Sequence, residues 1–197
     1  MRRLTALIKA IVPFPPEIRE EFFKIVKGLD LTPDEWVPDD LPTGTSIFVE
    51  DGLLLLTRCE KKKWRCSNFY LEGTLAVTYS EGATEMKDGS FRVRAVEPTR
   101  IYYMTREEER RVHEVFPTYN IVRHVLRQRS FFKSEQRKSL FQVPPADRIM
   151  IVDTFFRNLM RVPTEDLAEF LGLETEKQKK VLATFQKIRT SPHQEVS

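Results

Sequence analysis

The stretch that most constrains the fold of this chain lies near its C-terminus, at residues 160–185. Pro163 cannot continue a preceding helix, and Thr164 is a suitable N-cap for a short helix with an acidic first turn. Gly172 stands where a left-handed residue would end that helix, and a second helix is predicted from about Glu174 to Lys187. The apolar residues of this segment are Leu167, Ala168, Leu171, Leu173, Val181, Leu182 and Phe185. Helix, glycine turn and helix in this order predict a helix-turn-helix, whose second helix enters the DNA major groove.

Pairs of short amphipathic helices also occur in many proteins that do not bind DNA, so the motif alone leaves both interpretations open. The chain of 197 residues has room for one large domain or two small ones. Its hydrophobic content of 41% is enough for a core, and its 31% of charged residues suits a soluble protein. The net charge of +3 is too small to indicate a nucleic-acid partner by itself.

Two features of the N-terminal half bear on the cellular compartment. Cys59 and Cys66 lack the spacing of a zinc site; they could face each other across a hairpin, but reduced thiols are the preferred interpretation. Residues 1–12 look briefly like a signal peptide, but Lys9 interrupts the apolar run and no small-residue cleavage site follows. No apolar run approaches the ~20 residues that a bilayer requires. We therefore expect a cytoplasmic protein without a membrane partner, whose first helix presents Leu4, Leu7, Ile8 and Ile11 on one face.

The middle of the chain is predicted to be a small β-domain. A helix is expected from Pro16 to Lys27, and between Leu29 and Met104 short strands alternate with turn residues. The predicted strands are Glu35–Val37, Ser46–Val49, Leu53–Arg58, Trp64–Leu71, Thr74–Tyr79, Phe91–Val96 and Arg100–Met104. Asp51-Gly52 between two apolar runs predicts a tight hairpin, and residues 60–63 predict a solvated loop. So many short strands indicate an antiparallel barrel or roll.

Helical patterns return at Thr105, which begins a capping box. The apolar side of this helix is formed by Val112, Val115 and Phe116. A longer helix is predicted from Thr118 to about Phe141; its basic residues are typical of a solvated face, while its apolar stripe is also typical of a dimerisation seam. Another helix is predicted from Ala146 to Met160. Its buried side would be formed by Ile149, Val152, Phe156 and Leu159.

The order of these elements resembles that of the Crp/Fnr family of bacterial transcription regulators, most closely its short, divergent Bacteroidetes-type members. Residues 91–104 look like the strand pair that closes the family's cyclic-nucleotide-binding roll, and residues 105–119 are similar to the helix and proline that follow it. Pro144-Pro-Ala-Asp-Arg-Ile149 stands where the family has an Ala-Glu-Glu-Arg-Tyr type segment. Val162-Pro-Thr-Glu-Asp-Leu-Ala-Glu-Phe-Leu-Gly-Leu173 is similar to the family's Val-Pro-x-x-x-Ile-Ala-x-Tyr-Leu-Gly-Ile.

The resemblance implies an α+β architecture: N-terminal helices, an antiparallel β-roll of the jelly-roll type, a long dimerisation helix and a C-terminal helix-turn-helix. The expected domains are residues 1–117 for the roll, 118–142 for the connecting helix and 143–197 for the DNA-binding domain. It further implies a homodimer whose helix–helix contact is formed by Val122, Val125, Leu126, Arg129 and Phe132.

The phosphate-binding residues of the family's nucleotide-binding members are only partly matched. Those members use a Gly-Glu pair and an Arg-Ser/Thr pair, because arginine neutralises the cyclic phosphate and glutamate holds the ribose hydroxyl. Gly73 and Ser90 match, but Thr74 stands in place of the glutamate and Gly89 in place of the arginine. We therefore expect a degenerate effector pocket that does not bind cAMP or cGMP appreciably. Binding of another, unidentified small-molecule effector is the alternative. Phe48, Trp64, Tyr70 and Tyr79 would line an apolar pocket or, preferably, pack in the core.

The helix that would read DNA also departs from the family pattern. Gln178 replaces a buried leucine, and Leu182 replaces an exposed arginine. Lysine neutralises phosphates but reads guanine less selectively than arginine does. The residues expected to contact DNA are Thr164, Thr175, Lys177, Lys179 and Lys180.

Other chemistry is sparse in this sequence. His113, His124 and His193 match no metal spacing, and there is no phosphate-binding glycine loop or catalytic-serine motif. We expect no enzyme activity, no metal and no cofactor. Two functions remain: a dimeric transcription regulator, or a family member that senses a ligand or binds a partner after losing DNA binding.

Overall fold

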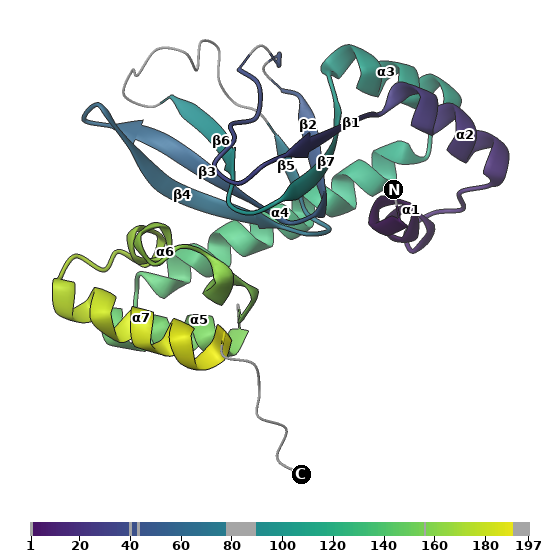
Figure 1. Cartoon of the computed structure of the whole chain (residues 1–197). Coiled ribbons are helices and arrows are strands. Elements are labelled where there is room, and N and C mark those ends of the chain that lie inside the picture. Colours follow the sequence, from purple (N-terminus) through teal and green to yellow (C-terminus); the bar gives the residue numbers. More distant parts are fainter. Residues whose placement is uncertain (1, 40, 43, 78–89, 156, 191–197) are drawn as a thin grey trace. The chain divides into compact units, whose positions relative to one another are not determined.

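The computed structural model describes residues 2–39, 41–42, 44–77, 90–155 and 157–190. It divides into two compact units, Met1–Lys133 and Ser134–Ser197, called here the roll unit and the C-terminal unit (Figure 1). The division falls within the long helix α4, Tyr119–Leu140. No helix of the described residues is long and apolar enough to cross a membrane.

The roll unit contains two antiparallel sheets. The first has the strand order β1-β7-β2-β5, and the second has the order β4-β3-β6. The strands are β1 Lys27–Leu31, β2 Ser46–Asp51, β3 Leu53–Glu60, β4 Lys63–Leu71, β5 Leu75–Val77, β6 Phe91–Ala95 and β7 Thr99–Met104. Their alternating side chains join the two sheets through one apolar core, as a roll requires. Members of this core from both sheets are Ile47, Val49, Leu54, Leu56, Tyr70, Val93 and Ile101.

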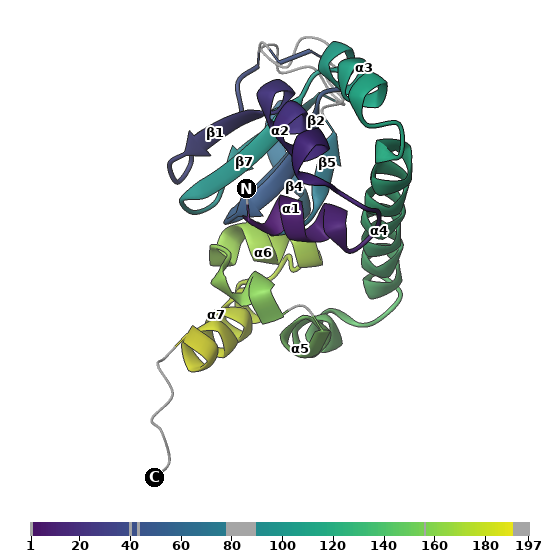
Figure 2. The same cartoon turned by 90° about the vertical axis from the view of Figure 1, so that its right-hand side faces the viewer.

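A second core lies on the other face of the first sheet, where helices cover it (Figure 2). These helices are α1 Arg2–Lys9, α2 Pro16–Ile25, α3 Arg106–Val115 and the first turns of α4. Pro16 occupies the first turn of α2, and Thr105 forms the predicted capping box of α3. Aromatic rings fill the space between the helices, with Phe14 stacked 5.2 Å from Phe116 and edge-on to Phe22 at 5.5 Å.

Two predictions for the start of the roll are wrong. The predicted strand Glu35–Val37 contributes only an isolated bridge between Trp36 and Arg94. The first strand is instead β1, whose initial residue Lys27 lies within the range predicted for the preceding helix. That helix already ends at Ile25. The predicted strand Thr74–Tyr79 contains β5, and its last two residues lie outside the described part of the chain.

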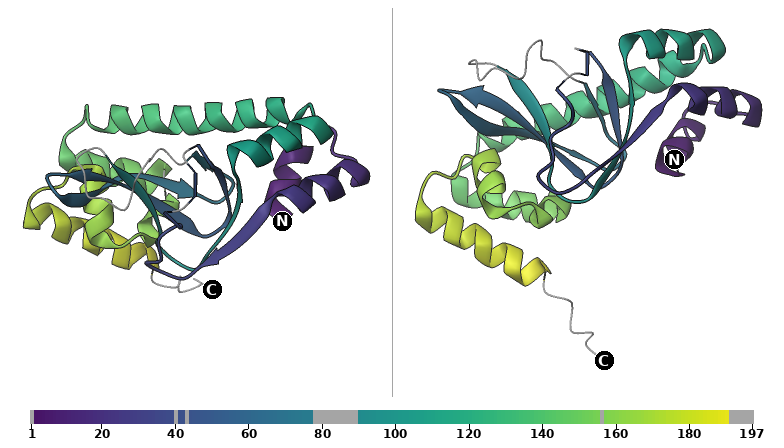
Figure 3. Two further views of the ribbon diagram at one scale, coloured as in Figure 1. Left: turned by 90° about the horizontal axis from the view of Figure 1, so that it is seen from above. Right: turned by 45° about the horizontal axis from the view of Figure 1, so that its top comes forward.

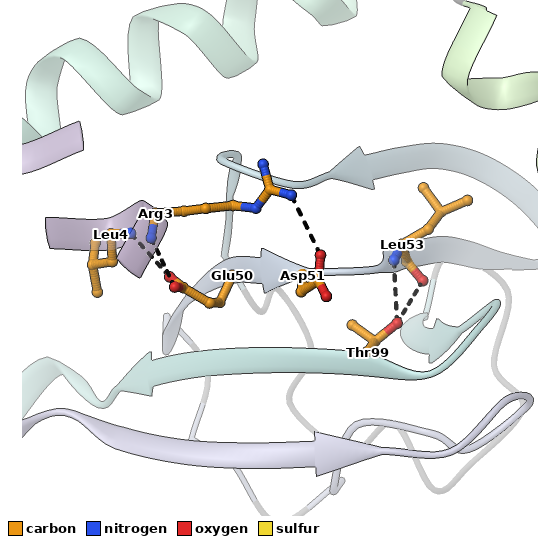
Figure 4. Close-up of polar contacts among 6 residues, drawn as sticks. All are labelled: Arg3, Leu4, Glu50, Asp51, Leu53 and Thr99. Carbon is orange, nitrogen blue, oxygen red and sulfur yellow. Dashed lines mark hydrogen bonds and ion pairs between the residues drawn. The ribbon is translucent and has the colours of Figure 1, made fainter. Parts of the chain in front are cut away.

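Asp51-Gly52 does not form a hairpin, because β2 pairs with β5 and β7 whereas β3 pairs with β4 and β6. Gly52 is instead the point where the chain passes from one sheet to the other, with φ +89°. A Cβ atom here would lie 2.5 Å from Thr99 Oγ1. That hydroxyl is hydrogen-bonded to the backbone N–H of Leu53 at 3.1 Å (Figure 4). The glycine therefore reflects a left-handed backbone and a close approach rather than a two-residue turn.

Residues 60–63 do connect two paired strands, and β3 and β4 form a hairpin with a register shift between Leu56 and Thr57. Cys59 lies opposite Trp64 and Cys66 lies opposite Thr57, so the two cysteines are not cross-strand partners. Both are buried free thiols.

The C-terminal unit contains α5 Pro145–Phe155, a 3-10 helix at Arg157–Arg161, α6 Thr164–Leu171 and α7 Glu176–Thr190 (Figure 3). The predicted helix Ala146–Met160 is thus divided, and its residue Phe156 lies outside the described part of the chain. Ile149, Val152 and Leu159 are buried as predicted.

Candidate functional site

The turn between α6 and α7 has the geometry that the sequence predicts. Gly172 is left-handed, with φ 63° and ψ 40°, and its N–H donates to the carbonyls of Ala168 and Glu169. The N–H of Leu173 donates to Ala168 O at 2.9 Å, and its side chain is buried. This pair of bonds satisfies the last carbonyls of α6 and fixes the direction in which the chain leaves the helix.

Thr164 is not the N-cap of α6, because Pro163 occupies that position and makes no side-chain capping bond. The hydroxyl of Thr164 donates instead to Gln186 Oε1 at 2.7 Å, across 22 residues of sequence. Gln186 is buried, and its Nε2 donates to Met160 O at 3.1 Å and to Val162 O at 2.7 Å. Thr164 therefore holds α6 against α7, and its predicted DNA contact stays a prediction.

The beginning of α7 is stabilised by a capping box. The Thr175 hydroxyl accepts the N–H of Gln178 at 3.3 Å, and the Thr175 N–H donates to Gln178 Oε1 at 3.1 Å. Gln178, which the resemblance marks as a lost leucine, thus has a defined function at the helix N-terminus. Leu182 is fully buried, so its position is part of the unit's core rather than an exposed arginine-like position.

The three lysines near the start of α7 differ in their surroundings. Lys177 and Lys180 are exposed. Lys179 Nζ lies 2.9 Å from Glu165 Oε2 and 3.6 Å from Glu176 Oε1. The hydrogen bond to Glu165 raises the pKa of Lys179 above its ordinary value, and the charges of both carboxylates act in the same direction. The structure therefore separates two solvent-facing lysines from one that is already paired.

Arg148 in α5 joins the end of α4 to the end of α6 within the C-terminal unit. Its Nη1 donates to Leu171 O at 2.7 Å, its Nε donates to Val143 O at 2.9 Å, and its guanidinium lies 4.9 Å from the ring centre of Phe141. Leu171 O is the last carbonyl of α6, which otherwise needs water, and Val143 O belongs to the loop that follows α4. The sequence resemblance includes Arg148 in the segment Pro144–Ile149 but does not predict its contacts with Val143 O and Leu171 O.

The residues of the predicted effector pocket are engaged within the roll. Gly73 is left-handed with φ 75°, and its N–H donates to Val49 O at 2.8 Å. The Thr74 hydroxyl donates to Leu71 O at 2.6 Å, and its side chain is buried. Ser90 pairs through its backbone carbonyl with the N–H of Cys59, and Gly89 lies outside the described residues.

Aromatic residues near this region are mainly structural. Phe48 belongs to the core under the helices and Tyr70 to the core between the sheets, as the preferred interpretation predicts. Trp64 is half-buried, and Tyr79 lies outside the described residues. Among the described residues no group of three or more histidines, cysteines and acids could hold a metal ion.

The long helix α4 has two apolar stripes. Val122 and Leu126 are 0% and 2% exposed and pack in the roll unit's own core. Because their side chains are already buried within one chain, they do not form the predicted contact with a second copy. The exposed stripe contains Ile121 at 51% and Phe132 at 63%, with the half-buried Val125 between them. Arg129 is exposed, and the stripe also includes Phe131 at 58%.

A buried polar chain connects the first sheet to α4 through α3. Ser46 Oγ donates to Glu109 Oε1 at 2.7 Å. The same carboxylate oxygen lies 3.4 Å from Arg123 Nε. A buried carboxylate of this kind is tolerated because it is paired and hydrogen-bonded.

The two-sheet roll, the helices that cover it, the long α4 and the C-terminal helix pair define a protein with the fold of the Crp/Fnr regulators. Solved structures agree with this assignment, as the sequence resemblance predicted. No protein-family model and no curated protein matches the chain.

Three of the similar structures illustrate the match. A cyclic nucleotide-binding domain containing protein from Listeria monocytogenes EGD-e has a TM-score of 0.63 at 14% identity, covering 93% of this chain and 89% of that chain. CLP, a c-di-GMP responsive global regulator from Xanthomonas campestris, has a TM-score of 0.62 at 15% identity, covering 88% and 93%. CprK complexed with OCPA has a TM-score of 0.57 at 17% identity, covering 88% and 84%.

Proposed function

We propose that this protein is a dimeric DNA-binding transcription regulator of the Crp/Fnr type in which α7 contacts DNA. The observation that carries the proposal is the pair Lys177 and Lys180, exposed on a helix whose N-terminus is capped and whose preceding turn is fixed. A helix held in this way keeps its side chains at constant positions, which recognition in a groove requires. CLP, which shares the fold, is a regulator of virulence gene expression.

The chemistry of the contact follows from lysine. Lys177 and Lys180 act on phosphates as point charges, and affinity then comes mainly from released counterions. Thr175 supports them by capping α7. Lys179 joins the contact only where a phosphate competes with Glu165.

Selection of genomic fragments with purified protein, at two salt concentrations, tests this function. We expect enrichment of specific fragments, and a salt dependence that becomes shallower by about 1.8 in log–log slope for Lys177→Ala/Lys180→Ala. The control variant Lys9→Ala/Arg111→Ala removes two exposed charges from the roll unit. Absence of salt-sensitive DNA binding in the unaltered protein contradicts the proposal.

The proposed dimer uses the exposed stripe of α4, namely Ile121, Val125 and Phe132, with Arg129 at its edge. Large exposed apolar side chains in a row on a long helix are costly in water and typical of a helix–helix contact. The polar chain Ser46–Glu109–Arg123 gives the roll a physical connection to this helix. A conformational change in the roll can thereby change the relative populations of different conformations of α4.

The effector is proposed not to be cAMP or cGMP. Thr74 presents a hydroxyl already bonded to Leu71 O rather than a carboxylate for a ribose. The fold itself accepts other ligands: CprK is complexed with OCPA, and CLP is responsive to c-di-GMP. Isothermal titration calorimetry with cAMP and cGMP is expected to show no binding in the micromolar range, and such binding would overturn this part of the proposal.

A second candidate is a family member that has lost DNA binding and binds a partner instead. It is favoured by the pairing of Lys179 with Glu165 and by Val181, which is 42% exposed on the same helix. An apolar side chain at this place suits a protein contact better than a phosphate backbone. The DNA selection described above separates the two candidates.

A further inference from the structure

The hairpin of β3 and β4 continues past the residues with which β6 pairs. Among the described residues, β6 pairs with β3 from Leu54 to Arg58, and just beyond this ladder the Cys59 N–H donates to Ser90 O at 2.8 Å. The pairs Cys59–Trp64 and Glu60–Lys63 extend the hairpin to its turn, and residues 58–65 are called here the ribbon. Figure 1 shows this ribbon extending past the end of β6.

This ribbon concentrates positive charge. Residues 58–65 contain five basic residues and one acid, a net charge of +4, while the whole chain of 197 residues has +3. The basic residues are Arg58, Lys61, Lys62, Lys63 and Arg65, and all five are exposed. The rest of the chain is therefore slightly acidic, and the ribbon is a local cationic feature rather than part of a basic protein.

Two features of the ribbon oppose its stability, one at its turn and one at its base, and both involve positively charged side chains. Lys61 and Lys62 have φ values of 50° and 59°, the left-handed conformation that two-residue turns normally assign to asparagine and glycine. Arg58 lies directly opposite Arg65, a like-charged cross-strand pair. Residues whose own conformational or charge preferences oppose the local structure are expected at positions where a function requires them.

The base of the ribbon is held firmly. The rings of Trp64 and Trp36 lie 6.2 Å apart, and the guanidinium of Arg92 lies 4.2 Å from the centre of the Trp36 ring. Arg92 also makes two hydrogen bonds to the carboxylate of Asp39, at 2.7 and 3.1 Å. These aromatic and ionic contacts therefore hold the base of the ribbon in place below its charged turn.

We propose that the β3–β4 ribbon is a second nucleic-acid contact of this protein, which binds the phosphates of duplex DNA. A two-stranded ribbon fits the major groove of B-DNA, which is about 12 Å wide. An acidic protein surface is the less suitable partner, because protein interfaces depend on buried aromatic or apolar anchors and Trp64 is already engaged with Trp36. Counterion release from a polyanion needs no such anchor. The ribbon contact does not depend on α7, which belongs to the other unit.

The test replaces the turn with the residues that its backbone favours, Lys61→Asn/Lys62→Gly. This change removes two charges and relieves the left-handed lysines, so thermal unfolding should occur at the same or a higher temperature. Binding to random-sequence duplex DNA at low salt should nevertheless weaken roughly three- to tenfold, and the log–log salt slope should become shallower by about 1.8. The matched control, Lys9→Gln/Arg111→Gln, loses the same charge elsewhere in the roll unit and should bind as the unaltered protein does.

Comparison with Lys177→Ala/Lys180→Ala distinguishes the two proposed contacts. If only the α7 variant loses binding, the ribbon proposal is overturned and the α7 contact stands. If only the ribbon variant loses binding, the ribbon stands and α7 is not the contact. Equal losses in the ribbon variant and its charge-matched control, or no DNA binding by the unaltered protein at low salt, overturn the ribbon proposal.

Discussion

Lys179 Nζ lies 2.9 Å from Oε2 of Glu165, which connects the first turns of α7 to the first turn of α6. The lysine that the sequence offers for a phosphate is therefore held by a carboxylate of its own unit. Its surroundings also place a negative charge close to the surface proposed to face DNA. For the proposed DNA contact, we expect this ion pair to make the affinity of α6–α7 for DNA lower than the number of lysines suggests.

Removal of this carboxylate is expected to strengthen DNA binding. Glu165→Gln frees Lys179 and removes a repulsive charge, so affinity for duplex DNA at low salt should rise roughly two- to fivefold, with a steeper salt dependence. Little change in unfolding temperature is expected, because exposed ion pairs contribute little to stability. Fluorescence anisotropy with labelled duplex measures the effect. Glu174→Gln removes an exposed acid from the same region; an equal gain there would mean that release of Lys179 is not the cause.

Gln186 is expected to be the main polar stabiliser of the C-terminal unit. Gln186→Leu leaves the carbonyls of Met160 and Val162 and the hydroxyl of Thr164 without this partner, at a cost of about 3 kcal/mol. Thr164→Val removes one of these bonds and should cost about 1 kcal/mol. Chemical denaturation of both single variants and the double variant measures the coupling. Additive losses would show that the two side chains do not act together.

Acid is expected to weaken the attachment of α1 to the roll through Glu50. Burial alone would raise the pKa of this carboxyl, but hydrogen bonds from the backbone amides of Leu4 at 2.9 Å and Arg3 at 2.7 Å hold the pKa below its ordinary value of 4.5 (Figure 4). A lowered folded-state pKa means stability that is present above the unfolded pKa and lost as pH falls through the folded one. Glu50→Gln should therefore be less stable than the unaltered protein by roughly 1–3 kcal/mol at pH 7.

The pH dependence of that difference is the decisive observation for Glu50. The gap between the two proteins should narrow as pH falls from about 5 to 3, because protonation removes the advantage of the carboxylate. Urea unfolding at several pH values measures it. A gap that is constant over this range would contradict the assignment.

Gly52→Ala is expected to destabilise the roll by roughly 2 kcal/mol or more. The new Cβ atom would lie 2.6 Å from Pro98 O and would also require a left-handed alanine. Gly73→Ala is the matched control, because it has a similar φ of 75° but nothing within 4 Å of the new atom. Thermal unfolding should show a clearly smaller loss for Gly73→Ala. Similar losses would mean that backbone conformation alone matters at Gly52.

The two stripes of α4 are expected to respond differently to substitution. Ile121→Asp/Phe132→Asp should give a folded monomer, because both side chains are exposed in the single chain, and its unfolding temperature should fall only by what the lost dimer contact contributes. Leu126→Ala should instead cost about 2–4 kcal/mol of stability, because its side chain is buried in the roll unit. Sedimentation of the proteins over a range of micromolar concentrations measures the association. A monomeric unaltered protein would contradict the proposed dimer.

Local signals in the sequence predicted local structure well. The capping box at Thr105, the helix start at Pro16 and the left-handed Gly172 each depend on residues within one turn of the chain, and all three are confirmed. Alternation of apolar residues likewise located most strands. Asp51-Gly52 failed because a turn signal does not specify which strand the next one pairs with.

The sequence by itself determined the order of strands β2 to β7 and of most helices, the N-cap of α3, and the resemblance that indicated the fold. The tertiary structure decided that Thr164 binds Gln186 rather than capping its helix, that Lys179 is paired, and that Val122 and Leu126 face the chain's own core. These outcomes depend on contacts between segments far apart in the chain, such as the 22 residues between Thr164 and Gln186. Side chains on a helix have the same periodicity whichever stripe is buried, so only the packed neighbours determine which stripe remains at the surface.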